Sequence, residues 1–187
     1  MSTVNKELMQ MVLKASAEDS NITIEDLKKF VEEHEKPKQP VKTTRYYDDE
    51  KTRIECEKWE LDGKLHREDG PAFTDYFGNG KICNNFYYIH GKLHREDGPA
   101  KIQYQYHTNG KIQRESYFIN GKQHREDGKP SQIVYSEDGC IVNEKYYING
   151  KLHRTDGPAE IEYNKDGQIV NETYYEDDKK IKETNYF

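Results

Sequence analysis

Residues 63–72 read GKLHREDGPA, and nearly the same ten residues return three more times. The copies begin at residues 63, 91, 121 and 150, so they are 28, 30 and 29 residues apart. The third copy is weakened and reads GKQHREDGKP. Self-similarity at such a period is typical of arrays in which one supersecondary unit stacks on its neighbours to bury an apolar face. The sequence therefore predicts a repeat protein.

Two sets of turn residues divide each repeat. The first set precedes each copy of the motif, at Asp62-Gly63, His90-Gly91, Asn120-Gly121 and Asn149-Gly150, and the second lies between the copies, at Asn79-Gly80, Asn109-Gly110, Asp138-Gly139 and Asp166-Gly167. Asn-Gly and Asp-Gly pairs between β-prone runs favour two-residue type I′ hairpins. We therefore expect a mainly β fold over residues 41–187, an elongated single-layer array of antiparallel hairpins with about two strands in each repeat of about 29 residues.

The hairpin turns also predict which side chains lie opposite one another. Counting outward from a two-residue turn pairs Tyr88 with Leu93 on one face. On the other face it pairs an aromatic residue with each histidine of the motif: Trp59 with His66, Tyr87 with His94, Tyr117 with His124, and Tyr146 with His153. Two further columns recur and should form ladders: Ile54, Ile82, Ile112, Ile141 and Ile169, and Tyr76, Tyr104, Tyr135 and Tyr163.

The first 36 residues differ from the rest and predict two short amphipathic helices. Val4, Leu8, Met11, Val12 and Ala15 form the apolar stripe of the first. Thr23 and Asp26 have the spacing of a capping box at the start of the second. A proline-containing linker, residues 37–40, then leads into the repeats. Three roles stay open for the helices: they cap the first strand, they form a homodimer, or they dock in a partner's groove.

Composition restricts the function class. The net charge of −6 arises from 29 basic and 35 acidic residues mixed along the chain, whereas broad affinity for nucleic acid or anionic membranes needs concentrated Lys and Arg. Polar residues interrupt the N-terminal apolar stretch, so we expect no signal peptide. Cys56, Cys83 and Cys140 are odd in number and lack metal-ligand spacing. These features predict reduced thiols and a cytoplasmic protein.

The repeat resembles the MORN family (membrane occupation and recognition nexus). The resemblance rests on an aromatic residue followed by Asn-Gly-Lys-x-His at residues 120–124 and 149–153, then an apolar and tyrosine-containing strand and an Asp-Gly turn. The usual unit is shorter and has Gly-x-Gly where this chain has Arg-Glu-Asp-Gly-Pro-Ala. Similar long units occur in phage, giant-virus and bacterial proteins. The resemblance implies an interaction scaffold, and one concrete version is a viral factor that binds and inhibits a host defence protein.

The histidine row is the sharpest candidate for metal binding or catalysis, since imidazole and carboxylate groups bind zinc and transfer protons. Repeated histidines about 10 Å apart, however, are too distant to share one metal ion. We therefore expect a structural role, with each imidazole packed on the aromatic ring opposite and each Arg paired with the acid of the next loop. Asp69, Asp97, Asp127 and Asp156 are expected to cap turns, helped by a glycine at positive φ. No catalytic motif is present, so we expect a non-enzymatic protein without metal or cofactor.

The remaining candidate is a surface for a protein partner. Tyrosine and Arg are enriched at the centres of interfaces, which selects the middle of the array: Tyr87, His94, Arg95, Tyr117, His124, Tyr146 and His153. The aromatic rows have a second interpretation, that they only stiffen the sheet. The departures of the third repeat at Gln123, Lys129 and Ser131 are either drift or a local contact site. The alternative function is binding of nucleic acid or a small ligand by the Tyr, His and Arg rows.

Overall fold

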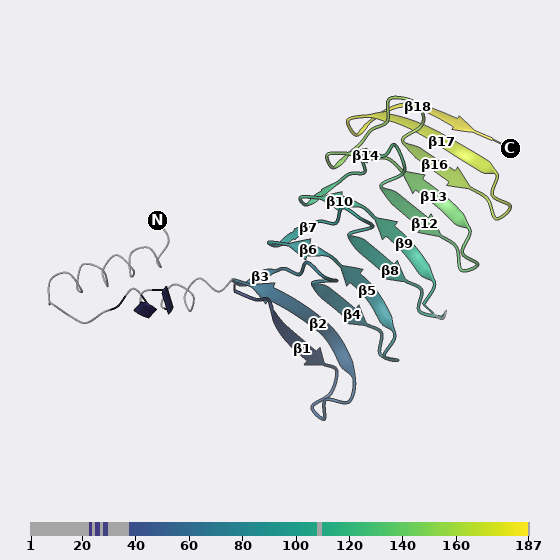
Figure 1. The fold of residues 1–187 in the computed structure, drawn as a ribbon. Helices are drawn as coiled ribbons and strands as arrows, with labels where there is room; N and C mark the ends of the chain where they lie inside the picture. Colours follow the sequence, from purple (N-terminus) through teal and green to yellow (C-terminus); the bar gives the residue numbers. More distant parts are fainter. Residues whose placement is uncertain (1–22, 24, 27, 30–37, 108–109, 187) are drawn as a thin grey trace. The chain divides into compact units, whose positions relative to one another are not determined.

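The repeats form one long antiparallel meander (Figure 1). The computed structural model describes residues 23, 25–26, 28–29, 38–107 and 110–186. The chain divides into two compact units, residues 1–39 and 40–187, and the sheet belongs to the second. The mainly β prediction is confirmed, because every strand pair in this unit is antiparallel.

Twelve strands make up the main sheet, of which β3 (Lys64–Leu65) pairs only with β2. The others follow one another across the sheet in chain order: β1 (Val41–Tyr46), β2 (Ile54–Leu61), β4 (Phe73–Tyr76), β5 (Ile82–Phe86), β8 (Lys101–Tyr104), β9 (Ile112–Ser116), β12 (Gln132–Tyr135), β13 (Ile141–Lys145), β16 (Glu160–Tyr163), β17 (Ile169–Glu176) and β18 (Lys179–Asn185).

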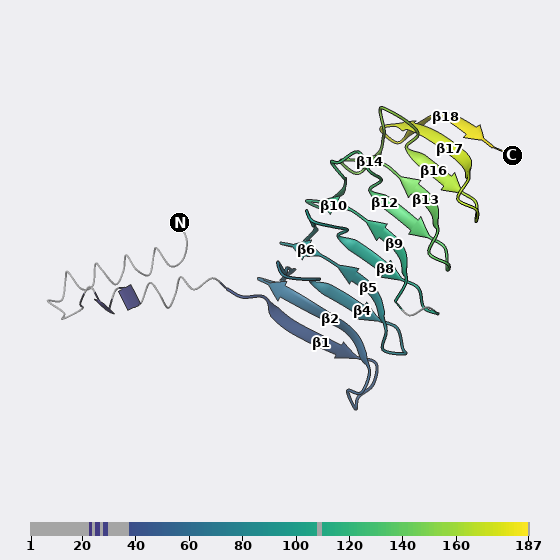
Figure 2. The ribbon, with the colours of Figure 1, turned by 45° about the vertical axis from the view of Figure 1, so that its right-hand side comes forward.

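Three short hairpins lie along one end of the main strands (Figure 1, Figure 2). They are β6 (Tyr88–Ile89) with β7 (Lys92–Leu93), β10 (Phe118–Ile119) with β11 (Lys122–Gln123), and β14 (Tyr147–Ile148) with β15 (Lys151–Leu152). A single residue separates each hairpin from the main strand before it: Tyr87, Tyr117 or Tyr146. Each of these repeats therefore holds two main strands and a separate short hairpin, rather than about two strands alone.

The two sets of turns have different backbones. In the first set both central residues have positive φ, as a type I′ turn requires; Asn120 and Gly121, for example, have φ of 52° and 82°. In the described part of the second set only the glycine has positive φ, as at Gly80 and Gly139. The last hairpin, β17–β18, makes the first kind of turn with Asp177 and Asp178, so two aspartates occupy the place of the usual Asn-Gly pair.

The predicted register is confirmed. Tyr88 lies opposite Leu93, and the backbone N–H of His94 donates to the carbonyl of Tyr87 at 3.0 Å. The tyrosine and isoleucine columns meet across one bulge in each main hairpin, where Tyr76 pairs with Ile82 and Tyr135 with Ile141. An added residue at the bulge increases the local twist.

The interior is thin, as the polar composition requires. The fully buried positions are small, with Ala72, Ala100 and Ala159 0% exposed and Ser131 1% exposed. Each of these residues accepts a hydrogen bond through its carbonyl from the backbone N–H of an aromatic residue, as Ala100 does from Tyr87 at 2.8 Å.

The tyrosine column is held by hydrogen bonds to carboxylates on neighbouring strands. The hydroxyl groups of Tyr76, Tyr135 and Tyr163 donate to Glu57, Glu115 and Glu144 at 3.0, 3.0 and 2.8 Å. In the second repeat Asn85 replaces the glutamate and donates to the Tyr104 hydroxyl at 3.2 Å. These phenols therefore stiffen the sheet, which is the structural role that cross-strand ladders favour.

The first predicted helix lies outside the described residues, as does most of the second. Around the predicted capping box, the backbone N–H of Asp26 donates to Thr23 Oγ1 at 3.1 Å and that of Thr23 donates to Asp26 Oδ2 at 2.8 Å. No helix among the described residues is long and apolar enough to cross a bilayer.

Candidate functional site

Each repeat stacks its motif arginine on the aromatic residue that lies four positions before the glycine of the type I′ turn. The guanidinium Cζ atom lies 4.0–4.4 Å from the ring centroid in all four cases: Arg67 over Trp59, Arg95 over Tyr87, Arg125 over Tyr117, and Arg154 over Tyr146. A cation over an aromatic face is attracted by the negative face of the ring. The arginine, and not the histidine as we had expected, packs on the aromatic side chain.

The same arginine pairs with the aspartate of its own loop. Arg95 Nε donates to Asp97 Oδ1 at 2.7 Å, and the equivalent bonds in the other repeats measure 2.7–3.0 Å. This corrects the expectation that the arginine pairs with the acid of the next loop, which fails because an aspartate only two positions along the chain already lies within hydrogen-bond distance. The Arg95 bond and charge hold the pKa of the Asp97 carboxyl below its usual value.

The glycine of the motif has a packing role that differs from the one we predicted. Gly70, Gly98 and Gly157 are not among the residues with positive φ. A Cβ atom built on Gly98 would lie 3.1 Å from Cζ of Arg95, so the guanidinium occupies the space that a side chain would need. Only Gly128, in the longer third loop, has positive φ, at 70°.

The imidazoles connect successive hairpins. In every repeat Nδ1 of the histidine accepts a hydrogen bond from a backbone N–H of the next type I′ turn: His66 from His90, His94 from Asn120, His124 from Asn149, and His153 from Asp177, at 3.1–3.3 Å. Since Nδ1 accepts, a neutral ring carries its proton on Nε2. A backbone bond supports each junction, as from Gly121 N–H to the Leu93 carbonyl at 2.7 Å.

The structure brings all seven predicted partner-binding residues into this layer of hairpins and loops, but it uses them internally. The side chain of His94 is 18% exposed and that of Arg95 is 26% exposed, and the three tyrosines are half-buried. By contrast Glu96 and Asp97 are 84% and 81% exposed. The sequence analysis gave Asp97 a turn-capping role and did not select Glu96. The sequence signal for the exposure of Glu96 and Asp97 was their position in a loop between two predicted hairpins.

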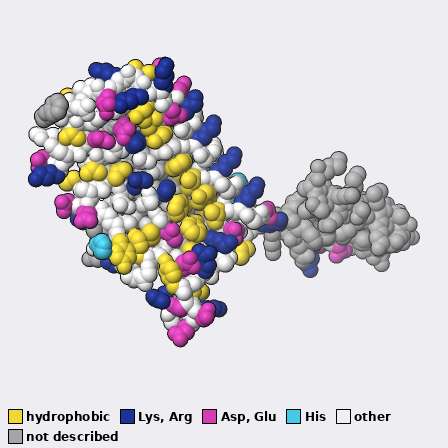
Figure 3. Space-filling view, turned by 180° about the vertical axis from the view of Figure 1, so that it is seen from behind, with side chains coloured by type: hydrophobic (Ala, Val, Ile, Leu, Met, Phe, Trp, Pro, Cys, Tyr) yellow, Lys and Arg dark blue, Asp and Glu magenta, His cyan; other side chains and the backbone are white. Residues whose placement is uncertain are grey.

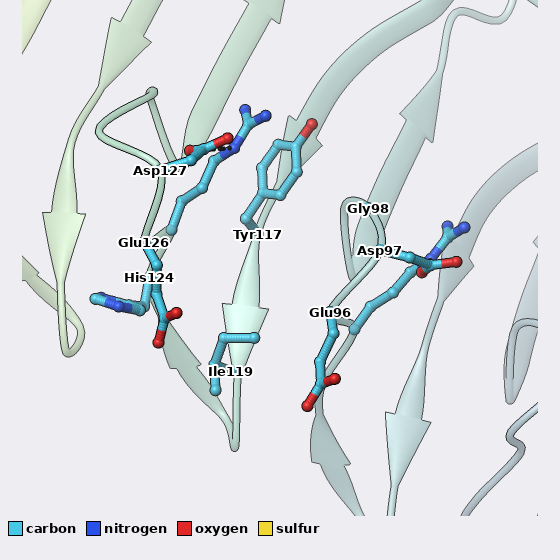
Figure 4. Close-up of a pocket in the computed structure, with 10 residues that line it drawn as sticks. Glu96, Asp97, Gly98, Tyr117, Ile119, His124, Glu126 and Asp127 are labelled. Atoms are coloured by element: carbon cyan, nitrogen blue, oxygen red, sulfur yellow. Dashed lines mark hydrogen bonds and ion pairs between the residues drawn. The ribbon is translucent and has the colours of Figure 1, made fainter.

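A groove of about 550 Å³ separates the second and third loops of the motif. Tyr117, which separates β9 from β10, and Ile119 of β10 lie between these loops. Glu96 and Glu126 point the same way from corresponding places on the two loops (Figure 4). A groove of about 350 Å³ follows between the third and fourth loops. The candidate site is this series, which we call the loop grooves, with stacked arginine and tyrosine inside and carboxylates at the rim.

Two of the three departures in the third repeat serve the interior. Gln123 Nε2 donates to the Ser131 carbonyl at 3.2 Å, and Ser131 Oγ accepts from the backbone N–H of Tyr147 at 2.9 Å. Lys129 is different, because its exposed ammonium lies 3.3 Å from Asp127 at the rim. The third loop is one residue longer than its neighbours, and Lys129 makes it less acidic than the second loop.

The cysteines and histidines form no cluster of metal-ligand type within the described residues: no group of three or more His, Cys, Asp or Glu is placed to hold a metal ion there. Cys56 is buried, Cys83 is half-buried and Cys140 is exposed, and all three are free thiols. Burial, together with the nearby Asp75 carboxylate, raises the pKa of Cys83 to about 11. At neutral pH that thiol is protonated and a poor nucleophile.

A further groove, which the sequence did not predict, lies at the opposite end of the main strands from the short hairpins, beside the long turn between β8 and β9. Two more residues lie between Tyr104 and Ile112 than between Tyr76 and Ile82. That difference in spacing was the sequence signal for this groove.

Comparisons of the chain with family models, curated proteins and solved structures gave no match.

Proposed function

We propose that this protein is a non-enzymatic scaffold that binds a protein partner along the loop grooves, and that its repeat is a variant of the MORN type. The observation that carries the proposal is the recurrence of a groove between successive loops, lined each time by a tyrosine and its stacked arginine. A repeated groove offers a wide surface, whereas catalysis needs unlike groups converging at one place. The hairpin meander with its type I′ turns supports the MORN-like assignment.

The partner surface should carry Lys or Arg. Each of the first three loops exposes a glutamate beside an aspartate that its arginine already neutralises, at Glu68, Glu96 and Glu126. Electrostatic complementarity of this kind mainly raises the association rate and the specificity. The partly exposed tyrosine and arginine below the rim would supply the central contacts.

Nucleic acid is the weaker alternative. The four motif arginines are stacked on rings and paired with aspartates, so a phosphate would have to displace a carboxylate from each one. Acidic rims would also repel the phosphate backbone. An electrophoretic shift with labelled DNA and RNA at two salt concentrations would reveal such binding.

Site-specific photo-crosslinking tests the proposal in the full chain. A photoreactive residue replaces Glu96 or Glu126 at the rim, or the exposed Lys165 at the far turn as a matched control. We expect one and the same protein to be crosslinked from both rim positions and not from Lys165. The double change Glu96→Lys with Glu126→Lys should lower the affinity for that protein by about tenfold or more. Crosslinking from Lys165 alone would place the interface elsewhere.

A further inference from the structure

The long turn of the second repeat places an exposed aromatic side chain, Tyr106, beside the turn of the first repeat. Tyr106 is 48% exposed. Its ring centroid lies 4.9 Å from that of Phe77, in the turn of the first repeat, and 4.8 Å from that of His107, both in edge-to-face geometry. Residues 104–107 and 110–112 of this turn are described. The insertion therefore distinguishes this turn from those of the first, third and fourth repeats.

Hydrogen bonds to the third repeat hold the base of this turn. Gln105 Nε2 donates to the Ser136 carbonyl at 2.6 Å, and Lys111 Nζ donates to the Glu137 carbonyl at 3.0 Å. The backbone N–H of Gln105 also donates to the Lys111 carbonyl at 2.9 Å. Tyr106 is thus presented to solvent from an anchored backbone, which lowers the entropy lost when a ligand packs on it.

A groove of about 480 Å³ lies beside Tyr106, within the usual range for small-ligand sites. Four amide side chains, from Asn84, Gln103, Gln105 and Gln113, line it together with phenol and hydroxyl groups. Its lining, within the described residues, contains no Lys or Arg and one carboxylate, Glu137. On the face that Figure 3 shows, hydrophobic side chains form separate bands among charged ones, not one continuous apolar patch.

These groups specify the chemistry of a ligand. Amide side chains both donate and accept hydrogen bonds, which suits neighbouring hydroxyl groups. An anion would find the Glu137 carboxylate, no Lys or Arg, and a single imidazole, that of His107. A purely apolar ligand would desolvate the amides without compensation. A ligand with one apolar face and many hydroxyls satisfies both the aromatic wall and the amides.

We propose that this groove, which we call the turn groove, binds a neutral carbohydrate of one or two hexose units, with a sugar ring against Tyr106. The turns of the first, third and fourth repeats lack the insertion, and the equally long β1–β2 turn has Asp48 at the position of Tyr106, so the described residues hold one such site. The proposal is independent of the protein-binding function, because the turn groove shares no residue with the loop grooves.

Two-dimensional amide NMR on the full chain tests the proposal with maltose, cellobiose, lactose and N,N′-diacetylchitobiose as probes. Titration to about 20 mM detects millimolar dissociation constants. We expect saturable shifts at the amides of Gln103, Tyr106 and Gln113 with at least one neutral sugar, and none with glucose 6-phosphate. Absence of saturable shifts there with all four disaccharides would overturn the proposal, as would binding of the phosphorylated sugar alone.

Variants locate the binding. Tyr106→Ala should raise the dissociation constant about tenfold, as loss of a central aromatic contact does, and Gln113→Ala, an exposed position, should weaken binding without affecting the fold. The matched control is Tyr186→Ala, because Tyr186 is also 48% exposed and lies outside the groove. Equal effects of the Tyr106 and Tyr186 changes would refute the site. The rim variant Glu96→Lys with Glu126→Lys should bind sugar normally.

Discussion

Nδ1 of His66 accepts a hydrogen bond from the backbone N–H of His90, 3.1 Å away and one repeat further along the chain. The His66 side chain is 5% exposed, and the two imidazole rings lie 4.4 Å apart. The same bond recurs at each following junction. Because it joins a side chain of one hairpin to the backbone of the next, it couples the folding of neighbouring repeats, on which the stability of a repeat array depends.

Replacing His66 tests this coupling. His66→Ala removes the acceptor and should lower the free energy of unfolding by about 1–3 kcal/mol, the cost of leaving a part-buried donor unsatisfied. His66→Asn keeps an oxygen near the position of Nδ1 and should retain more of the stability. His94→Ala should cost less, since that side chain is 18% exposed. Urea unfolding curves measure all three, and equal losses for the Ala and Asn variants of His66 would contradict the acceptor role.

The stack of Arg95 on Tyr87 should appear as a coupling energy in a double-mutant cycle. With Tyr87→Leu and Arg95→Met we expect about 0.5–1 kcal/mol, the range for exposed cation–π pairs. Lys101 over Phe86, where the ammonium lies 5.5 Å from the ring centroid, provides a weaker comparison pair. Since the stack is part of the fold, truncating Tyr87 should lower stability as well as binding. The exposed Glu96 is therefore the better probe of binding alone.

Gly98 and Gly121 should respond to alanine for different reasons. Gly121→Ala forces φ of 82° on a residue with a Cβ atom and should cost about 1–2 kcal/mol in any background. Gly98→Ala instead pushes the Arg95 guanidinium away from Tyr87. Its cost should disappear when Arg95 is already Ala. Thermal unfolding of the single and double variants distinguishes the two cases, and a Gly98 effect that persists without Arg95 would be inconsistent with the packing role.

The carboxyl of Asp97 should titrate below its usual pKa of 3.8 because of the hydrogen bond and charge of Arg95. A depressed folded-state pKa contributes stability above the usual value, and that contribution is lost as the pH falls through the folded-state pKa. Carbon-detected NMR of the Asp97 carboxyl gives the value directly. In Arg95→Ala the Asp97 pKa should return towards 3.8, and an unchanged pKa in that variant would exclude the pairing.

Tyr76 should ionise late at alkaline pH. Burial, and then the hydrogen bond to Glu57, raise the pKa of Tyr76 to about 12 from 10.0. Because the folded-state pKa is the higher one, the stability linked to Tyr76 is complete below about pH 10 and is lost as the pH rises towards 12. The absorbance of tyrosinate, compared between the protein and Tyr76→Phe, measures this step. A difference centred near pH 10 would mean that the hydroxyl is solvated.

The sequence by itself determined the repeat, the antiparallel meander and the register of its hairpins. These follow from local chemistry: Asn120 and Gly121 adopt positive φ together, and a two-residue turn then pairs Tyr117 with His124 by counting. The tyrosine and isoleucine columns were also predictable, because they recur at the same place in each unit.

Only the tertiary structure decided which partner each side chain takes. Pairing places His94 opposite Tyr87, but the strand breaks at Tyr87, so the arginine covers the ring and the histidine reaches Asn120 in the next hairpin. That bond joins residues 26 positions apart, a separation at which sequence pattern carries no geometric information. The turn groove depends likewise on Phe77, Tyr106 and Ser136 from three different turns, which only the stacking of the sheet brings together.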